Sequence, residues 1–259
     1  MHVIRVEFDS KDGIPANVRE EISTELRSHV FEREANTAYL NDLADEIAEV
    51  GVGGALQNRG FFRARAVAKL TALRSDGADI PVAITISATP GTQYRTRNVR
   101  FESADSDFPL GIGAEVLRGL IPLREGELFN VERVRTGMEN LTLAYGREGY
   151  VDMVPEPKFK IDEGHQIIDL VFRIDQGTQY RVGSIEFLGV NSVTREKLME
   201  SLSKSGDIFD AARLEVFFKV NRATLPSDAS RDDVKITRDV RTKTVALLFD
   251  FRTCPRDSN

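Results

Sequence analysis

The chain lacks most of the residue patterns that mark chemically active proteins. Its 259 residues include a single cysteine, Cys254, so no internal disulfide bond can form. The three histidines, His2, His29 and His165, are far apart and show no paired-histidine or Cys/His spacing. These absences argue against a metal site. Cys254 lies in a polar tail without a nearby base, so we expect it to be an inert thiol.

Long apolar runs and an excess of basic residues are also missing. No apolar run reaches the ~18 residues that a membrane helix needs, and the first residues enter a strand-like pattern without the apolar region of a signal peptide. The chain is therefore either cytosolic or a processed or truncated piece of an exported protein. The net charge of −6 argues against nucleic acid as the main partner, because phosphate binding needs a basic surface.

A five-residue repeat is the most informative feature that is present. The segment Gly-Thr-Gln-Tyr-Arg begins at Gly91 and again at Gly177, 86 residues later. Each copy follows an alternating apolar run and starts a new strand, so each is interpreted as a joint between two domains. We therefore predict three units, 1–91, 92–177 and 178–253, followed by a polar tail, 254–259.

The first unit shows the clearest order of elements. His2 to Phe8 alternates as a half-buried strand, with Val3 predicted on the face of Arg5 and Glu7, opposite Ile4, Val6 and Phe8. Apolar residues at helical spacing then predict two helices. A hairpin with its turn at 75–77 completes the unit. The residues that carry the helices are Ile14, Val18, Ile22 and Leu26, then Leu40, Leu43, Ile47 and Val50; the hairpin strands are 64–74 and 80–88.

Glycines interrupt the second of these helices. The segments 51–54 and 111–113 superficially resemble phosphate-binding loops, but neither has the lysine of a P-loop or the strand–loop–helix context. Helix breaks or close packing are the better interpretation. We expect the helix to continue to about Gln57 and to end at Gly60-Phe61.

The second and third units repeat the order. A helix starting at the N-cap Asn130 is predicted to end at Gly149-Tyr150, the counterpart of Gly60-Phe61. The third unit lacks this glycine–aromatic pair, and its acidic run 228–233 is interpreted as a solvated loop. The strands expected in these units are 97–102, 151–161, 166–175, 181–188, 233–241 and 244–252. In 233–241, Val234, Ile236 and Val240 are predicted to face the core.

The common order is strand, helix, helix, strand, strand. Two helices can cover one face of a three-stranded sheet, so each unit is predicted to be a two-layer α+β domain.

Three such units in tandem resemble POTRA (polypeptide-transport-associated) domains, found in outer-membrane β-barrel assembly and secretion proteins of the bacterial surface-antigen family. The resemblance rests on the glycines, tyrosine and apolar residues from Gly177 to Asn191 and on Gly149-Tyr150, with weaker copies at Gly91 to Tyr94 and Gly60-Phe61. It covers residues 3–252. It implies three tandem POTRA-like domains with a periplasmic location. Gly91, Tyr94, Gly177, Tyr180 and Gly183 are the joint residues expected.

The resemblance also implies that the second strand of each sheet is an edge. An unfolded client chain could add a strand there through main-chain hydrogen bonds. Pro155 and Pro157 would blunt the edge in the second unit, so we predict usable edges in the first and third units. The candidate client-binding residues are Arg65, Val67, Lys69, Thr71, Lys235, Thr237, Asp239 and Arg241. The alternative is that the edges are only solvated and protected by their basic residues.

The leading hypothesis is therefore a periplasmic binding module without catalysis, cofactor, metal or small-molecule substrate. Its expected partners are unfolded outer-membrane proteins or accessory assembly proteins, with a β-barrel in the same full-length chain or in a separate one. A structural alternative is a POTRA-like scaffold that docks folded partner proteins. An enzyme is disfavoured because no convergent acid, base and nucleophile set occurs.

Overall fold

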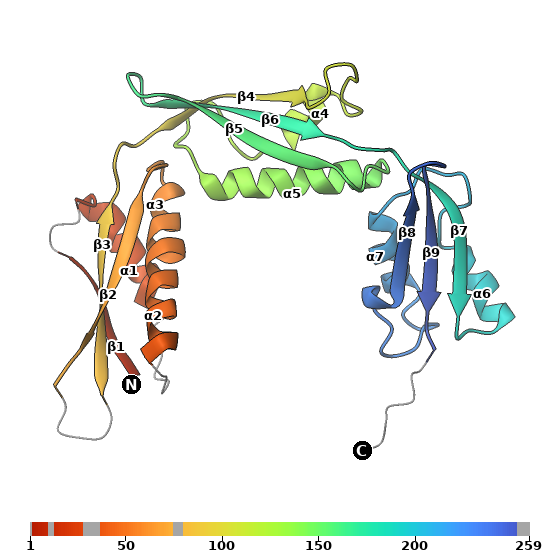
Figure 1. The fold of residues 1–259 in the computed structure, drawn as a ribbon, viewed down its shortest axis with the longest axis horizontal. Coiled ribbons are helices and arrows are strands. Elements are labelled where there is room, and N and C mark those ends of the chain that lie inside the picture. The colour runs from red at the N-terminus through yellow and green to blue at the C-terminus, as the bar shows by residue number, and fades with distance from the viewer. Residues whose placement is uncertain (1, 10–12, 28–36, 75–79, 253–259) are drawn as a thin grey trace. The chain divides into compact units, whose positions relative to one another are not determined.

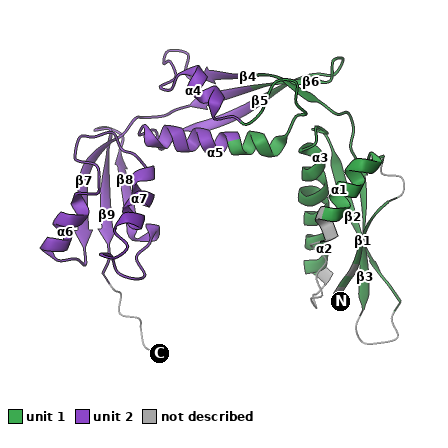
Figure 2. Ribbon diagram, turned by 180° about the vertical axis from the view of Figure 1, so that it is seen from behind, with its two compact units in different colours: residues 1–99, 122–136, 159–170 green, residues 100–121, 137–158, 171–259 purple. Residues whose placement is uncertain are grey.

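The computed structural model describes residues 2–9, 13–27, 37–74 and 80–252. Cys254, His29 and the turn predicted at 75–77 lie outside these ranges. The chain divides into two compact units (Figure 2). Unit 1 contains 1–99, 122–136 and 159–170, and unit 2 contains 100–121, 137–158 and 171–259.

Three mixed three-stranded sheets organise the chain, with strand orders β1-β3-β2, β4-β6-β5 and β7-β9-β8 (Figure 1). The predicted strand–helix–helix–strand–strand order is confirmed in each. The second strand of each group lies at an edge of its sheet, as the resemblance implied. The first sheet belongs to unit 1 and the third to unit 2, while the residues of the second sheet are divided between both.

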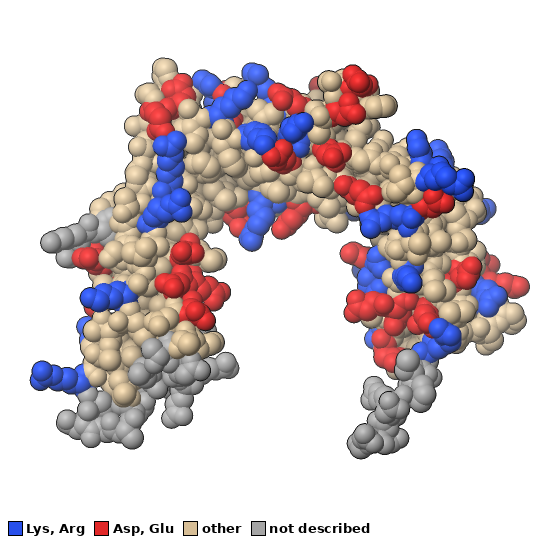
Figure 3. Space-filling view, in the orientation of Figure 1, with Lys and Arg blue, Asp and Glu red and all other residues tan. Residues whose placement is uncertain are grey.

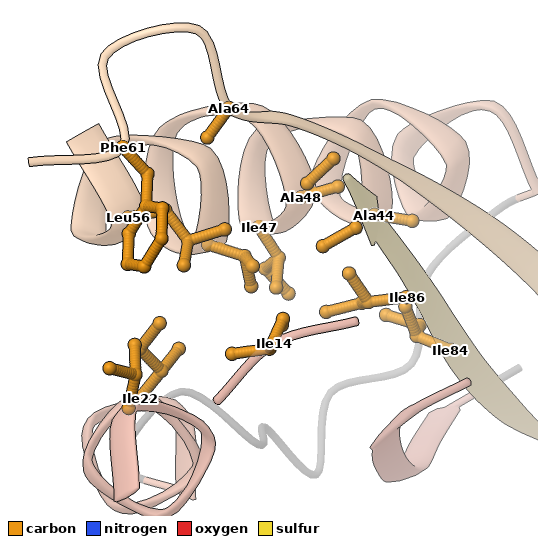
Figure 4. Close-up of a cluster of buried hydrophobic side chains, with 14 of the residues drawn as sticks. Ile14, Ile22, Ala44, Ile47, Ala48, Leu56, Phe61, Ala64, Ile84 and Ile86 are labelled. Atoms are coloured by element: carbon orange, nitrogen blue, oxygen red, sulfur yellow. The ribbon is translucent and has the colours of Figure 1, made fainter. Parts of the chain in front are cut away.

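The first sheet and its helices form one hydrophobic core. Its strand β1 pairs in parallel with β3, which pairs antiparallel with β2. Buried isoleucines from the helical layer and from β3 meet there, including Ile22, Ile84 and Ile86 (Figure 4). The elements are β1 His2–Phe8, α1 Ala16–Arg27, α2 Thr37–Glu46, η1 Ile47–Gly53, α3 Gly54–Gln57, β2 Arg65–Ala72 and β3 Pro81–Thr89.

The face predicted for Val3 is wrong, because β1 contains a bulge. Val3 pairs with Val82 but Arg5 pairs with Ala83, so one extra residue lies between them. The bulge turns Val3 into the core while Arg5 stays exposed. Strand β7 has an equivalent irregularity between Val182 and Ser184.

The glycines at 51–54 do not break the second helix. The helix runs on to Gln57 as predicted, but it widens into a π-helix over Ile47–Gly53 before α3. Its buried residues include Ala48 and Val52. Ala44, Ala48 and Ala64, which precedes β2, belong to the same buried cluster (Figure 4). Small side chains here allow the helical layer to approach the edge strand.

The second sheet confirms the predicted N-cap. The Asn130 side-chain oxygen accepts the N–H of Arg133 at 2.9 Å at the start of α5. The ring of Phe101 stacks on that of Phe172, with centroids 5.7 Å apart. The elements are β4 Arg95–Ser103, α4 Ala114–Gly119, α5 Val131–Arg147, β5 Val154–Asp162 and β6 Ile167–Asp175.

The third sheet has an aromatic core. In it the ring of Phe187 stacks on that of Phe249, with centroids 4.6 Å apart. The helix without a terminal glycine ends at Asn221, whose buried amide donates to the Ser201 hydroxyl at 2.7 Å. The elements are β7 Arg181–Leu188, α6 Ser192–Met199, α7 Ala212–Val220, η2 Arg231–Asp233, β8 Val234–Asp239 and β9 Thr244–Asp250.

The prediction that Val240 faces the core is wrong. Strand β8 ends at Asp239, whose carboxylate accepts the N–H groups of Arg241 at 2.9 Å and Thr242 at 3.2 Å. These bonds start the hairpin turn, and Val240 is 66% exposed within it. Arg241 lies beyond the strand for the same reason.

Candidate functional site: the domain joints and the sheet edges

The first predicted joint is centred on Tyr94, which is buried. Its N–H donates to the carbonyl of Gly60 at 2.8 Å, and its carbonyl accepts the N–H of Phe129 at 2.9 Å. Gly60 has a φ of +92°, and an added Cβ would lie 2.8 Å from the Tyr94 carbonyl oxygen. Only glycine fits here. The N–H of Phe61 donates to the carbonyl of Leu56 at 3.1 Å. The predicted glycine–aromatic pair therefore does end the helix.

The second joint repeats these bonds. The N–H of Tyr180 donates to the carbonyl of Gly149 at 2.9 Å, and the carbonyl of Tyr180 accepts the N–H of Phe209 at 3.0 Å. Gly149 has a φ of +83°, and a Cβ would lie 2.6 Å from the Tyr180 carbonyl oxygen. The N–H of Tyr150 donates to Tyr145 at 2.9 Å, which is the counterpart of the Phe61 bond.

The glutamines of the repeat act alike in both joints. The Gln93 side chain donates to the carbonyl of Arg59 at 2.7 Å, and the Gln179 side chain donates to the carbonyl of Glu148 at 2.9 Å. Each acceptor is the residue before the positive-φ glycine. Both glutamines therefore satisfy a carbonyl at the end of a helix, where the helix itself supplies no donor.

The arginines of the repeat are also equivalent. The guanidinium of Arg95 donates to the carbonyl of Gly126 at 2.7 Å, and that of Arg181 to the carbonyl of Gly206 at 2.8 Å. The backbone N–H groups of the two arginines donate to Gln166 and Lys243, both at 3.0 Å. The sequence repeat therefore corresponds to a repeated set of hydrogen bonds.

The remaining predicted joint residues are less crowded or lie elsewhere. Gly91 and Gly177 have φ values of +71° and +62°, and a Cβ on Gly91 would meet nothing within 4 Å. Gly183 lies inside β7, at the bulge. A Cβ there would lie 3.1 Å from that of Thr244, so this glycine allows β7 and β9 to approach closely.

The predicted edge residues of the first sheet all lie on β2. Arg65, Val67, Lys69 and Thr71 are exposed along β2 and share one face. Val67 is 64% exposed. Among the described residues β2 pairs with β3 on one side only, so the backbone groups on its other side form a free edge.

The other two edges differ from β2. In the third sheet, Lys235, Thr237 and Asp239 lie on β8 and are exposed, but β8 spans only six residues. In the second sheet, β5 contains Pro155 and Pro157. Two prolines two residues apart remove donors from the same side of the strand, and a paired strand tolerates this only at its free edge.

A comparison with known protein families finds a match for the residues of the second sheet. Residues 94–177 match the POTRA family, described as a surface antigen variable number repeat. These residues form a POTRA domain. The whole chain has the fold of three tandem POTRA domains, since it superposes on the crystal structure of Haemophilus influenzae BamA POTRA3-5 with a TM-score of 0.66. The identity is 14%, and the match covers 97% of this chain and 96% of that chain.

Two further structures have lower scores. BamA from Haemophilus ducreyi lacking POTRA domains 1-3 has a TM-score of 0.47 at 16% identity over 71% of this chain and 32% of that chain. POTRA1-3 of the periplasmic domain of Omp85 from Anabaena has a TM-score of 0.39 at 14% identity over 100% of this chain and 98% of that chain.

POTRA domains are non-catalytic scaffold modules. Among the described residues no three His, Cys, Asp or Glu side chains gather where they could hold a metal ion. No helix in the described ranges has the length and hydropathy needed to span a bilayer. On the face shown in Figure 3, basic and acidic side chains are interspersed.

Each POTRA joint also contains a tyrosine–carboxylate–arginine triad that the sequence analysis missed. In the first joint the hydroxyl of Tyr94 donates to the carboxylate of Glu163, which also binds the guanidinium of Arg63 at 2.8 Å. The hydrogen bond to Glu163, and secondly burial, raise the pKa of the Tyr94 phenol. The phenol therefore stays protonated as the donor at neutral pH.

The second triad has the same members in a different arrangement. The hydroxyl of Tyr180 donates to the carboxylate of Asp152 at 3.1 Å, and this carboxylate also binds the guanidinium of Arg238. Burial, and secondly the hydrogen bond to Asp152, raise the pKa of the Tyr180 phenol. Sequence offers one signal for the triads: Arg63 and Asp152 each stand three residues after a helix-ending glycine.

Proposed function

We propose that these POTRA domains form a periplasmic module that receives unfolded outer-membrane proteins by adding their strands to the free edge of β2. The location and the class of client follow the fold-level likeness to BamA POTRA3-5 and to the POTRA family. The membrane partner proposed is a β-barrel, in the same full-length chain or in a separate one. Accessory assembly proteins are the other proposed partners.

The single observation that supports this site is the free edge of β2. Its eight residues contain neither proline nor glycine, so every residue keeps an N–H group and no glycine weakens the strand. Outward-facing Arg65 and Lys69 protect the edge against uncontrolled pairing, as basic residues do on natural edges. An extended client can still bind there, since augmentation uses main-chain groups and tolerates most side chains.

The three edges are proposed to differ in use. Strand β8 offers a shorter edge, and its Arg238 is already paired with Asp152. Strand β5 is proposed to act only as a spacer because of its two prolines. We therefore expect client binding to be strongest at β2, weaker at β8 and least at β5.

A photocrosslinking scan tests the proposal. A photoreactive residue replaces Val67 on β2, Lys158 on β5 or Lys235 on β8, and each variant is mixed with an unfolded peptide from an outer-membrane barrel strand. We expect labelling in the order β2, β8, β5. A peptide N-methylated at alternate residues is the matched control, because it keeps the side chains and loses donors along one edge.

A gain-of-function variant sharpens the test. Pro155→Val with Pro157→Val restores two donors to β5 and should raise its labelling toward that of β2. Strong labelling along 151–161 in the unaltered chain, with none at β2 or β8, would refute the edge assignment. Labelling that N-methylation leaves unchanged would refute strand addition. Binding of a folded partner but of no unfolded peptide would favour the scaffold alternative.

A further inference from the structure

A cavity of about 420 Å³ opens beside the second joint, and all the residues that line it belong to unit 2, drawn in purple in Figure 2. Its walls come from the loop after β4, the segment that connects β6 to β7, and the turn between β8 and β9. Ligand sites in proteins usually have volumes of roughly 300–1,000 Å³. This cavity is therefore large enough for a long side chain and the main chain beside it.

Two aromatic residues line the cavity. Phe108 is 63% exposed and lies in the loop after β4, where its N–H donates to the carbonyl of Asp105 at 3.3 Å. Tyr150 is half-buried, and a Cβ added to Gly111 would lie 2.8 Å from its hydroxyl oxygen. The loop therefore packs directly on the Tyr150 side chain, and both rings offer surface to a ligand.

The side chain of Gln176 holds this loop in place. Its oxygen accepts the N–H of Gly111 at 2.8 Å, and its nitrogen donates to the carbonyl of Pro109 at 2.9 Å. One amide thus ties the loop to the segment between β6 and β7 with two hydrogen bonds. The cavity is already formed in the absence of a ligand, as is usual for binding sites.

Carboxylates outnumber basic groups at the cavity. Asp105 and Asp175 line it, whereas Lys243 is the one lining residue with a basic side chain, and every lining residue is described. One oxygen of Asp105 accepts the N–H of Asp107 at 3.0 Å, and one oxygen of Asp175 accepts the N–H of Gly177 at 3.2 Å. The second oxygen of each carboxylate makes no hydrogen bond within the described part of the chain. The cavity therefore offers acceptors to a cationic group.

We propose that this cavity binds the arginine side chain of an extended peptide partner. A guanidinium stacks on aromatic rings and presents a planar set of donors to carboxylates. Phe108 and Tyr150 provide the rings, and Asp105 and Asp175 provide the carboxylates. A lysine ammonium has no planar face to stack, so arginine fits this combination better. The site is in unit 2 and does not depend on strand addition at β2, which is in unit 1.

The first joint does not repeat the residues that make this site. Counting back by the repeat of 86 residues, the counterparts of Asp175 and Gln176 are Thr89 and Pro90. Threonine supplies no carboxylate, and proline supplies no side-chain amide to tie a loop. Binding of an arginine side chain is therefore expected at the second joint and not at the first.

Nuclear magnetic resonance titration of the intact ¹⁵N-labelled chain tests the inference. The probe is the blocked tripeptide Ala-Arg-Ala, and the matched control replaces its arginine with citrulline, which has a similar shape and no charge. We expect the arginine peptide to shift the amide signals of Thr178, Gln179 and Lys243 in a saturable way. The citrulline peptide should bind about tenfold more weakly, which corresponds to the loss of about 1.4 kcal/mol.

Substitutions in the cavity assign the contacts. Phe108→Ala removes a ring, and Asp175→Asn removes a charge while it keeps an oxygen that accepts the N–H of Gly177. Each should weaken binding of the arginine peptide about two- to fivefold. Val116→Ala changes an exposed apolar residue of α4 that does not line the cavity, so this control should leave binding unchanged. Unaltered amide signals elsewhere in unit 2 show that each variant is folded.

Four results would overturn the proposal. The first is equal binding of the arginine and citrulline peptides. The second is binding that Phe108→Ala and Asp175→Asn both leave unchanged. The third is tighter binding of the tripeptide Ala-Lys-Ala, which would reject the guanidinium, and the fourth is tighter binding of Ala-Glu-Ala, which would show that Lys243 decides the charge preference. None of these results bears on the labelling of β2, so this proposal and the proposed function can fail separately.

Discussion

The two joints share one backbone framework and differ in the side chains around it. In both, a tyrosine N–H binds a positive-φ glycine, and a glutamine and an arginine bind nearby carbonyls. The first joint adds an aromatic cluster in which Phe62 lies 5.4 Å from Phe129 and 5.0 Å from Phe159. The second has Val151 two residues after its glycine. The shared hydrogen bonds define a joint, and the side chains around them differ between the two joints.

The largest expected effect comes from the framework glycines. Gly149→Ala forces a Cβ against the Tyr180 carbonyl at a positive φ and should lower the free energy of unfolding by about 3 kcal/mol. Gly60→Ala should cost slightly less, because its Cβ would lie 2.8 Å rather than 2.6 Å from the carbonyl. Urea denaturation followed by circular dichroism measures both.

Gly91→Ala is the control for the glycine prediction. Gly91 also has a positive φ but meets nothing within 4 Å, so only the backbone term of about 1 kcal/mol applies. Equal losses at Gly91 and Gly149 would mean that backbone conformation, and not the contact with Tyr180, makes the joint glycine necessary.

Substitutions in the aromatic cluster should have the next largest effect on the free energy of unfolding and should distinguish the two joints. Phe62→Ala removes two ring contacts from the first joint and should cost about 2 kcal/mol, whereas Val151→Ala at the second should cost about 1 kcal/mol. The same denaturation assay compares them. Equal costs would show that the first joint gains nothing from its aromatic residues.

Removing the tyrosine hydroxyls should have a smaller effect. Tyr94→Phe and Tyr180→Phe each lose one hydrogen bond to a carboxylate, at about 1 kcal/mol. We expect the larger loss at Tyr94, because the hydrogen bond is the main cause of its raised pKa while burial is the main cause at Tyr180. A larger loss for Tyr180→Phe would contradict this order.

The raised tyrosine pKa values also predict a pH dependence. A pKa that is higher in the folded chain contributes stability that is present below the unfolded value of about 10 and is lost as pH rises through the folded value. The difference in stability between the parent chain and Tyr94→Phe should therefore shrink from pH of about 9 upward. Denaturation at several alkaline pH values measures this difference in stability. A difference that grew with pH would contradict the prediction.

Much of the fold could be predicted because its signals are local. The bounds of β1 and β7 and the N-cap Asn130 agree with expectation, since alternation and capping depend on neighbouring residues. The bulge that buries Val3 could not be predicted, because it depends on pairing with β3, more than 70 residues away. The exposure of Val240 depends on where the β8–β9 turn begins. The domain boundaries near 91 and 177 and the client-binding residues stay predictions.

The sequence by itself determined that the chain repeats one two-layer unit and that Tyr94 and Tyr180 occupy equivalent positions, because a repeat and its periodicities can be counted along the chain. Only the tertiary structure decided which charges meet at the joints. Tyr94 and Glu163 are 69 residues apart, and Asp152 and Arg238 are 86 apart. Such pairs form when separate elements pack together, and no local pattern in one sequence records that geometry.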